Sequence, residues 1–191
     1  MKAAVRELLE RALELARAGV RVYEAAIGCA VRDPLEQQWQ DDLSQIRRHE
    51  HALRTAASRM GIDPEAETSL RLLVRKQAQA IMAALEQACD KAPADEVERL
   101  AAECVLEWES RTHVAWDLLY ELAAEATGEE GEALRAACAE APDQQDERLH
   151  RARAWTRSLW LAALGRPSAV PSRRQRPRRR RGVAHDGAPR T

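Results

Sequence analysis

The chain has 191 residues, of which 45% are apolar and 32% are charged, a balance typical of a water-soluble globular protein. A domain of this length buries about 70% of the surface that the unfolded chain exposes, which is enough for a core without disulfides or a structural metal. Aromatic residues make up only 4% of the sequence and Phe is missing, whereas Ala, Leu, Arg and Glu are abundant. This composition favours helices and excludes an all-β fold, which needs β-branched and aromatic strands.

The net charge of −1 combines an acidic body with a basic tail. Residues 166–191 contain nine Arg and one Asp, so residues 1–165 carry the compensating negative charge. The tail is rich in Arg, Pro and Gly and has few residues to bury, which predicts disorder. We therefore expect one helical domain over residues 1–165 and a disordered Arg/Pro-rich tail over residues 166–191.

Four cysteines are widely spaced and form no Cys-x-x-Cys pair: Cys29, Cys89, Cys104 and Cys138. We interpret them as small, buried apolar residues in a reducing compartment. The chain begins with MKAAVRELLERALELA, whose acidic side chains inside an apolar pattern indicate an amphipathic helix rather than a signal peptide. The sequence lacks a run of about 18 apolar residues that would predict a membrane span. These features predict a cytoplasmic protein without a membrane partner.

Apolar residues recur at spacings of three and four along most of the body, and Gly, Pro and Asp interrupt the pattern where helices end. Gly61 suits the left-handed position after a helix, and Asp63-Pro64 supplies an N-cap followed by Pro at the first helical position. Long helices with short connections pack as antiparallel neighbours, so we expect an all-α, up-and-down four-helix bundle with additional helical segments. The predicted helices span about residues 2–31, 35–60, 64–90, 95–126, 129 to a break at Pro142, and 143–164.

Ionisable residues inside the apolar stripes are the informative positions, because such residues are rarely buried without a partner. Each of four helices places a Glu in or beside its stripe. Two of these Glu precede a His by three or four residues, which puts both side chains on one helix face. The set is Glu24, Glu50, Glu109 with His113, and Glu147 with His150.

Four carboxylates and two imidazoles directed into a bundle are the inventory of a carboxylate-bridged di-iron site, since two cations need anionic bridges and neutral nitrogen donors. The usual pattern has two Glu-x-x-His pairs, whereas here Glu147 and His150 form one, and Glu50 has His49 and His51 as neighbours. In the alternative interpretation each His bonds a Glu across one turn, and the other Glu reach solvent at the stripe edges. Joint placement on four helices favours the metal, because an unpaired buried carboxylate is costly.

Three stretches resemble bacterial ferritin-like domain proteins, a branch of the ferritin and rubrerythrin superfamily: HEHALRTAASRMGIDP, ECVLEWESRTHVAWDLL and DERLHRARAWTRSLWLAALGRP. The resemblance covers about residues 20–167, and its most specific part is the final helix with Glu147, His150, Trp155 and Trp160. It implies a ferritin-like antiparallel four-helix bundle that holds two irons. The implied ligands are Glu24, Glu50, Glu109, His113, Glu147 and His150, with His49 or His51 as further candidates on the second helix.

The implied chemistry is the reaction of bound iron, or a related divalent metal, with dioxygen or peroxide, in iron oxidation or in protection against oxidative stress. Tyr23, Trp108, Trp116 and Tyr120 near the ligands would transfer electrons or, in the commoner case, simply belong to the core. Superfamily members range from small assemblies to cages, so a homo-oligomer is compatible with the resemblance.

Two other functions stay open. A metal-free helical bundle would act as a protein-interaction module, with its Glu and His residues in surface pairs. The arginines of the tail would bind nucleic-acid phosphates with strongly salt-dependent affinity, although a simply solvated tail is the favoured interpretation because no aromatic residue is interleaved for base stacking. These arginines are Arg173, Arg174, Arg176 and Arg178 to Arg181.

Overall fold

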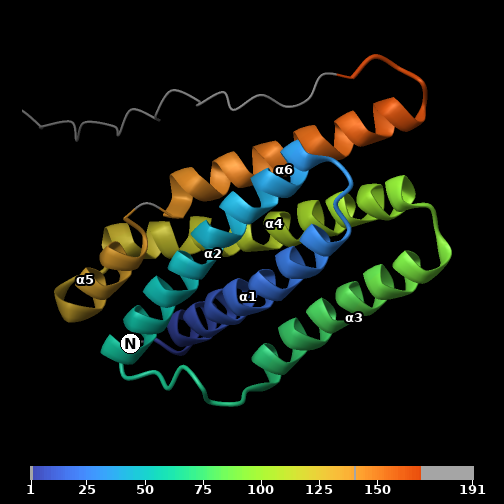
Figure 1. Ribbon diagram of the computed structural model, residues 1–191. Helices are drawn as coiled ribbons and strands as arrows, with labels where there is room; N and C mark the ends of the chain where they lie inside the picture. Colours follow the sequence, from blue (N-terminus) through green and yellow to red (C-terminus); the bar gives the residue numbers. More distant parts are fainter. Residues whose placement is uncertain (1, 140, 169–191) are drawn as a thin grey trace, which may run out of the picture.

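The computed structural model describes residues 2–139 and 141–168, which fold into six helices and contain no strand (Figure 1). The all-α prediction is therefore confirmed for this part of the chain. Nearly all of the Arg-rich tail, residues 169–191, lies outside the described residues. The helices are α1 (Ala3–Gly28), α2 (Asp33–Arg59), α3 (Ser69–Lys91), α4 (Ala94–Glu125), α5 (Gly128–Ala137) and α6 (Ala141–Ala163).

Helix α1 packs against three neighbours, α2, α3 and α4, and α6 runs along α4 (Figure 1). The short α5 contacts both α2 and α4. The sequence explains why α1 has so many neighbours: it buries residues on several faces, among them Leu9, Leu13, Leu15 and Val22. Helix α3 buries a narrower stripe, formed by Arg71, Val74, Ala78 and Leu85. Its other faces are available to solvent or to a partner.

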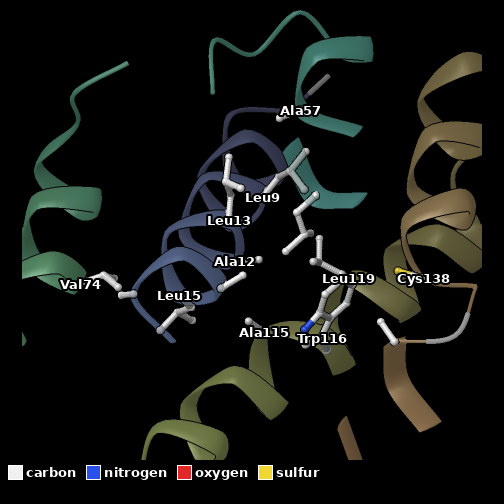
Figure 2. Packing of buried hydrophobic residues seen from close by; sticks show 14 of the residues in the cluster. Leu9, Ala12, Leu13, Leu15, Ala57, Val74, Ala115, Trp116, Leu119 and Cys138 are labelled. Carbon is white, nitrogen blue, oxygen red and sulfur yellow. The ribbon is translucent and has the colours of Figure 1, made fainter. Parts of the chain in front are cut away.

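Two large apolar clusters fill most of the interior, and a small third one consists of Ala56, Ala133 and Ala137. In the first, Leu9 and Leu13 of α1 pack with Trp116 and Leu119 of α4, and Val74 joins from α3 (Figure 2). Burial of each such side chain stabilises the fold by about 1.5 to 3 kcal/mol. The second cluster joins the other ends of α1 and α4 to α2 and α6, and it includes Tyr23, Leu35, Trp39, Val105, Trp155 and Leu159.

Helix α3 begins at Ser69 and not at Pro64, so the predicted start is wrong by five residues. The reason is Arg71, whose buried guanidinium donates hydrogen bonds to the backbone carbonyls of Asp63, Pro64 and Ala66. These carbonyls are thereby satisfied outside a helix. The side chain of Thr68 then caps α3 by accepting a bond from the Arg71 N–H.

Other helix ends follow the sequence more closely. Gly61 has a φ of 69°, and Ile62 N–H bonds the Ala57 carbonyl, as predicted for a glycine-terminated helix. Helix α1 ends at Gly28, before the predicted Val31, because the buried Glu98 carboxylate of α4 accepts the N–H groups of Val31 and Arg32 in the connection to α2. Pro142 falls in the first turn of α6, where its missing N–H costs nothing.

The cysteine prediction is only partly correct. Cys29 and Cys138 are buried as expected, but Cys89 is exposed and Cys104 is intermediate. Cys89 is exposed because it lies in α3, which buries only one narrow stripe.

None of the six helices in the described part of the chain combines the length and apolarity needed to cross a bilayer.

Close packing of α1 on α4 depends on Gly19, since a Cβ at this position would lie 2.9 Å from Nε1 of buried Trp108. That nitrogen donates to the Leu15 carbonyl, so the ring cannot move without losing a hydrogen bond. We expect Gly19→Ala to lower the free energy of unfolding by about 1 to 3 kcal/mol, despite the better helix propensity of Ala. Urea denaturation measures this.

The matched control is Gly28→Ala, because a Cβ at Gly28 would meet no atom within 4 Å. This variant should keep or slightly raise the stability of the wild type. A Gly19→Ala protein as stable as Gly28→Ala would show that α1 and α4 are not in contact at Gly19.

Candidate functional site

A group of buried polar side chains separates the two apolar clusters. We call it the polar centre, and it consists of Tyr23, His49, Glu109, Gln145 and Arg148, which are between 0 and 6% exposed. These residues come from four helices, α1, α2, α4 and α6. Along α4, for example, Glu109 lies between Val105 of the second cluster and Ala115 of the first. The centre is therefore enclosed by apolar packing on both sides.

Glu109 is the anion of the polar centre. Its Oε1 accepts a hydrogen bond of 2.8 Å from the Tyr23 hydroxyl, and its Oε2 accepts one from the Gln145 amide. The Arg148 Nε lies 3.4 Å from both carboxylate oxygens. Burial raises the pKa of Tyr23 well above its ordinary value, and the Glu109 charge adds to this effect. Tyr23 therefore stays a protonated donor.

Arg148 is the cation of the polar centre. Besides Glu109, its guanidinium donates to the Gln145 side-chain oxygen, to Gln45 Oε1 at 3.3 Å and to His49 Nδ1 at 3.4 Å. The planar guanidinium offers five donors in a fixed geometry, and these acceptors lie around it. A buried ion pair of this kind survives desolvation only when further hydrogen bonds satisfy both partners, a condition that Tyr23 and Gln145 help to meet.

His49 is held neutral. Burial, together with the nearby Arg148 charge, lowers the pKa of the imidazole to about 3. Because Nδ1 faces the Arg148 donor, Nε2 carries the proton and donates to Gln144 Oε1 at 2.9 Å. The ring also meets Trp116 edge to face, with 5.3 Å between centroids. His49 thus acts here as a hydrogen-bond acceptor for arginine.

A second ion pair, between buried Asp42 and partly buried Arg151, adjoins the polar centre. Asp42 of α2 accepts bonds from Arg151 of α6 and, at 3.2 Å, from Gln38. Burial raises the pKa of Asp42 to about 6, although Arg151 and Arg148 act in the opposite direction. The two pairs each join α6 to another helix, Asp42–Arg151 to α2 and Glu109–Arg148 to α4.

A small cavity borders the polar centre next to His49, Glu109, Thr112 and Arg148. It leaves about 10 Å³ for the centre of a water-sized sphere. This is enough for about one water molecule, but the surface that faces the cavity is apolar. An organic substrate would not fit without separation of the helices.

The structure places the predicted ligands of α1 and α2 toward the surface. The Glu24 side chain is 47% exposed and pairs with Arg47 at 2.8 Å. The Glu50 side chain is 21% exposed and bonds Arg54 at 2.7 Å and Arg17 at 3.4 Å. Both carboxylates therefore lie at stripe edges with arginine partners. This agrees with the alternative interpretation, in which these Glu reach solvent at the edges of the apolar stripes.

The predicted ligands of α4 and α6 also separate. Glu109 is the buried member of the set, whereas His113 lies at the rim with Asp117 at 3.3 Å and Asp146 at 3.4 Å. Glu147 pairs with Arg151, and His150 is exposed. The structure thus directs only Glu109 of the six into the polar centre.

These positions bear on the predicted iron site. Among the residues that the structure describes, no group of three or more His, Cys, Asp or Glu side chains is arranged to hold a metal ion. With these side-chain positions, the six predicted residues do not fit one dimetal centre, because Arg148 neutralises Glu109 and the other five have surface partners or face solvent. The metal, its ligands and its oxidant stay predictions from the sequence.

On α1 and α2, the residues that enter the polar centre are immediate neighbours of the predicted ligands. Tyr23 takes the inward position beside Glu24, and His49 takes the one beside Glu50. In α6, the apolar stripe of Leu149, Ala152 and Trp155 extends backward to Arg148 and Gln145. That apolar stripe was the sequence signal that Arg148 and Gln145 face inward. A shift of one residue along a helix changes the direction of the side chain by about 100°.

Compared with known proteins, the chain matches no family model, no curated protein and no solved structure. The resemblance to ferritin-like domain proteins therefore depends on the quoted motifs.

The polar centre predicts a large difference between two Glu-to-Gln substitutions. Glu109→Gln leaves Arg148 buried without its counter-ion and should lower the free energy of unfolding by about 3 to 5 kcal/mol. Glu24→Gln, the matched surface control, should change it by less than about 1 kcal/mol. Chemical denaturation of both variants beside the wild type tests this. Similar stabilities of the two variants would contradict a buried ion pair.

His49 predicts a specific loss of stability in acid. Its pKa of about 3 in the folded state lies below the ordinary value of 6.5, so only the unfolded state binds a proton between these limits. The stability contributed by neutral His49 is present above pH 6.5 and is lost as the pH falls toward 3. Between pH 7 and pH 5 the wild type should lose about 2 kcal/mol more than His49→Gln.

Asp42 gives the free energy of unfolding the opposite pH dependence. Its pKa is raised to about 6, so the stability that protonated Asp42 contributes is lost as the pH rises through that value. Both proteins contain Asp42, so the difference between them isolates His49. Parallel stability curves of wild type and His49→Gln would contradict a buried neutral imidazole.

Proposed function

We propose that this protein is a helical interaction module that binds a second copy of itself through an apolar groove between α1, α3 and α4. We further propose that α1, α2, α4 and α6 form a ferritin-like four-helix bundle whose charged interior is completed by arginine. The exposed apolar groove is the observation that carries the proposal. What supports the bundle is that the polar centre takes its side chains from these four helices.

The groove has about 360 Å³ of space for the centre of a water-sized sphere. Apolar residues dominate its lining, and four large ones are Leu8, Leu70, Val114 and Leu118. Val114 is 57% and Leu118 45% exposed, which places them among the most exposed large apolar residues of the described chain. Contiguous exposed apolar surface of this kind marks interaction sites.

The groove exists because the α3–α4 hairpin opens toward one end. Arg111 of α4 donates to Gln77 of α3 at 2.7 Å. Beyond this bond, Leu70 continues the α3 stripe of Gln77, and Val114 and Leu118 continue the α4 stripe of Arg111. These three residues form apolar walls of the groove, together with Ala4 and Leu8 of α1.

Charge at the rim favours a second copy as the occupant. Glu7, Arg11 and Arg111 line the groove, so both signs are present on one patch. In a two-fold dimer the same patch meets itself, and each Glu is then able to face an Arg of the other copy. The ridge of Val114 and Leu118 would fill the groove of the partner.

The polar centre supports a bundle that is complete without added ions. Arg148 supplies the positive charge that Glu109 requires, and the adjoining cavity has room for about one water molecule. The competing proposal is the one made from the sequence, a dimetal carboxylate protein that reacts with dioxygen or peroxide. It draws support from the burial of Asp42, His49 and Glu109, which are residue types that ligate iron.

Sedimentation of the full chain over a range of concentrations tests the groove. The wild type should form dimers, and Leu118→Glu should weaken association at least about 100-fold, because a charge would be buried in the interface without a partner. Leu164→Glu is the matched control, since Leu164 is 67% exposed and lies beyond α6, outside the groove lining. A wild type that stays monomeric at all attainable concentrations, or equal effects of both variants, would overturn the proposal.

Anaerobic loading with Fe(II), followed by metal analysis, decides between the two proposals for the interior. An arginine-completed centre predicts almost no bound iron in either the wild type or a Glu109→Ala, Glu147→Ala double variant. About two irons per chain in the wild type, lost in the double variant and oxidised on addition of peroxide, would establish the dimetal protein instead.

A further inference from the structure

Two cysteines far apart in the sequence meet between the C-terminal ends of α1 and α3. The Sγ atoms of Cys29 and Cys89 lie 3.5 Å apart, although 60 positions separate the two residues along the chain. Cys29 is the residue that caps α1, and Cys89 lies in the last turn of α3. The contact brings together two groups with redox chemistry, which their spacing in the sequence did not predict.

The two thiols differ in their surroundings. Cys89 is exposed, whereas Cys29 is buried and donates its S–H to the Ala25 carbonyl at 3.3 Å. Burial raises the pKa of Cys29 to about 12, and the bond to Cys89 contributes. Cys29 is thus a protonated, shielded thiol, while Cys89 is the one that a solute reaches. An accessible thiol beside a second, resolving thiol is the arrangement of redox-responsive cysteines.

We propose that Cys29 and Cys89 are a peroxide-responsive pair that forms a reversible disulfide between α1 and α3. Hydrogen peroxide is the oxidant. The Cys89 thiolate attacks the O–O bond, forming a sulfenic acid and releasing hydroxide, which takes up the proton that Cys89 lost. The Cys29 sulfur then displaces the sulfenic hydroxyl, which leaves as water with the Cys29 proton. Two thiols are oxidised and one peroxide is reduced to two molecules of water.

The fold leaves room for this step. The sulfurs must move from 3.5 Å to a bond of about 2.05 Å. Cys29 lies after the last residue of α1, at the start of the connection to α2, where the backbone adjusts more easily than inside a helix. The bond would close a long loop and fix the otherwise narrowly packed α3 to α1, so oxidation should raise thermal stability.

To test this, the full-length protein is reduced, freed of reductant and treated with hydrogen peroxide at increasing ratios of peroxide to protein. Free thiols are then counted in denaturant, and disulfides are mapped by mass spectrometry of unreduced tryptic peptides. We expect the thiol count to fall from four to two per chain, a single peptide pair joining Cys29 to Cys89, and full reversal by dithiothreitol. The oxidised protein should melt several degrees above the reduced one.

Three single Cys→Ser variants assign the roles. Cys89→Ser should lose no thiols at the peroxide ratio that oxidises the wild type. Cys29→Ser should accumulate a sulfenic acid at Cys89 that dimedone traps. Cys138→Ser, the control, should form the same disulfide as the wild type, because Cys138 is buried away from the pair in the first apolar cluster. Circular dichroism confirms that each variant is folded.

A disulfide that joins Cys89 to Cys104, or to Cys89 of another chain, would overturn the proposal. Irreversible oxidation of Cys89 without a disulfide would overturn it too, as would equal melting temperatures of the reduced and oxidised proteins. The dimer and iron experiments do not depend on these outcomes, because the groove and the polar centre contain none of the four cysteines.

Discussion

The buried ion pair between Glu109 and Arg148 is the interaction on which the rest of the interior depends. Removing two charges from water is costly, and the cost is recovered only if donors and acceptors surround both groups. Tyr23, Gln145 and His49 meet this condition in the structure. Because the pair and these three residues together come from four helices, their contacts fix the rotation of each helix about its own axis. The two apolar clusters then pack on either side of it.

Helix α3 borders both surface features that we propose to be functional. It is attached to α1 by one narrow stripe, with Arg71 tying down the segment before it. One end of α3 borders the apolar groove, and the other brings Cys89 to Cys29. The association surface and the thiol pair that we propose are thus at opposite ends of α3, a helix that buries only a narrow stripe. The polar centre, by contrast, lies among helices held together by ion pairs and aromatic packing.

The comparison between the two interpretations of the interior depends on helix register. A carboxylate and an imidazole on neighbouring turns give the same sequence pattern whether they face the interior or the solvent. Only ligands that face the interior converge on metal ions. Here the positive charge beside Glu109 is the arginine Arg148, and three of the six predicted ligands, Glu24, Glu50 and Glu147, pair with arginines nearer the surface. The abundance of arginine in this chain makes such pairing available on nearly every helix.

The sequence by itself determined the helical class, most helix ends and the presence of buried polar residues on four helices, because apolar periodicity, Gly, Pro and capping residues act locally. It also singled out Glu109. Only the tertiary structure decided which neighbour of each candidate points inward, that Arg148 faces Glu109, that Arg71 delays α3, and that Cys29 meets Cys89. The Glu109–Arg148 and Cys29–Cys89 contacts join residues 39 and 60 positions apart. Helix packing brings them together, and no local pattern encodes it.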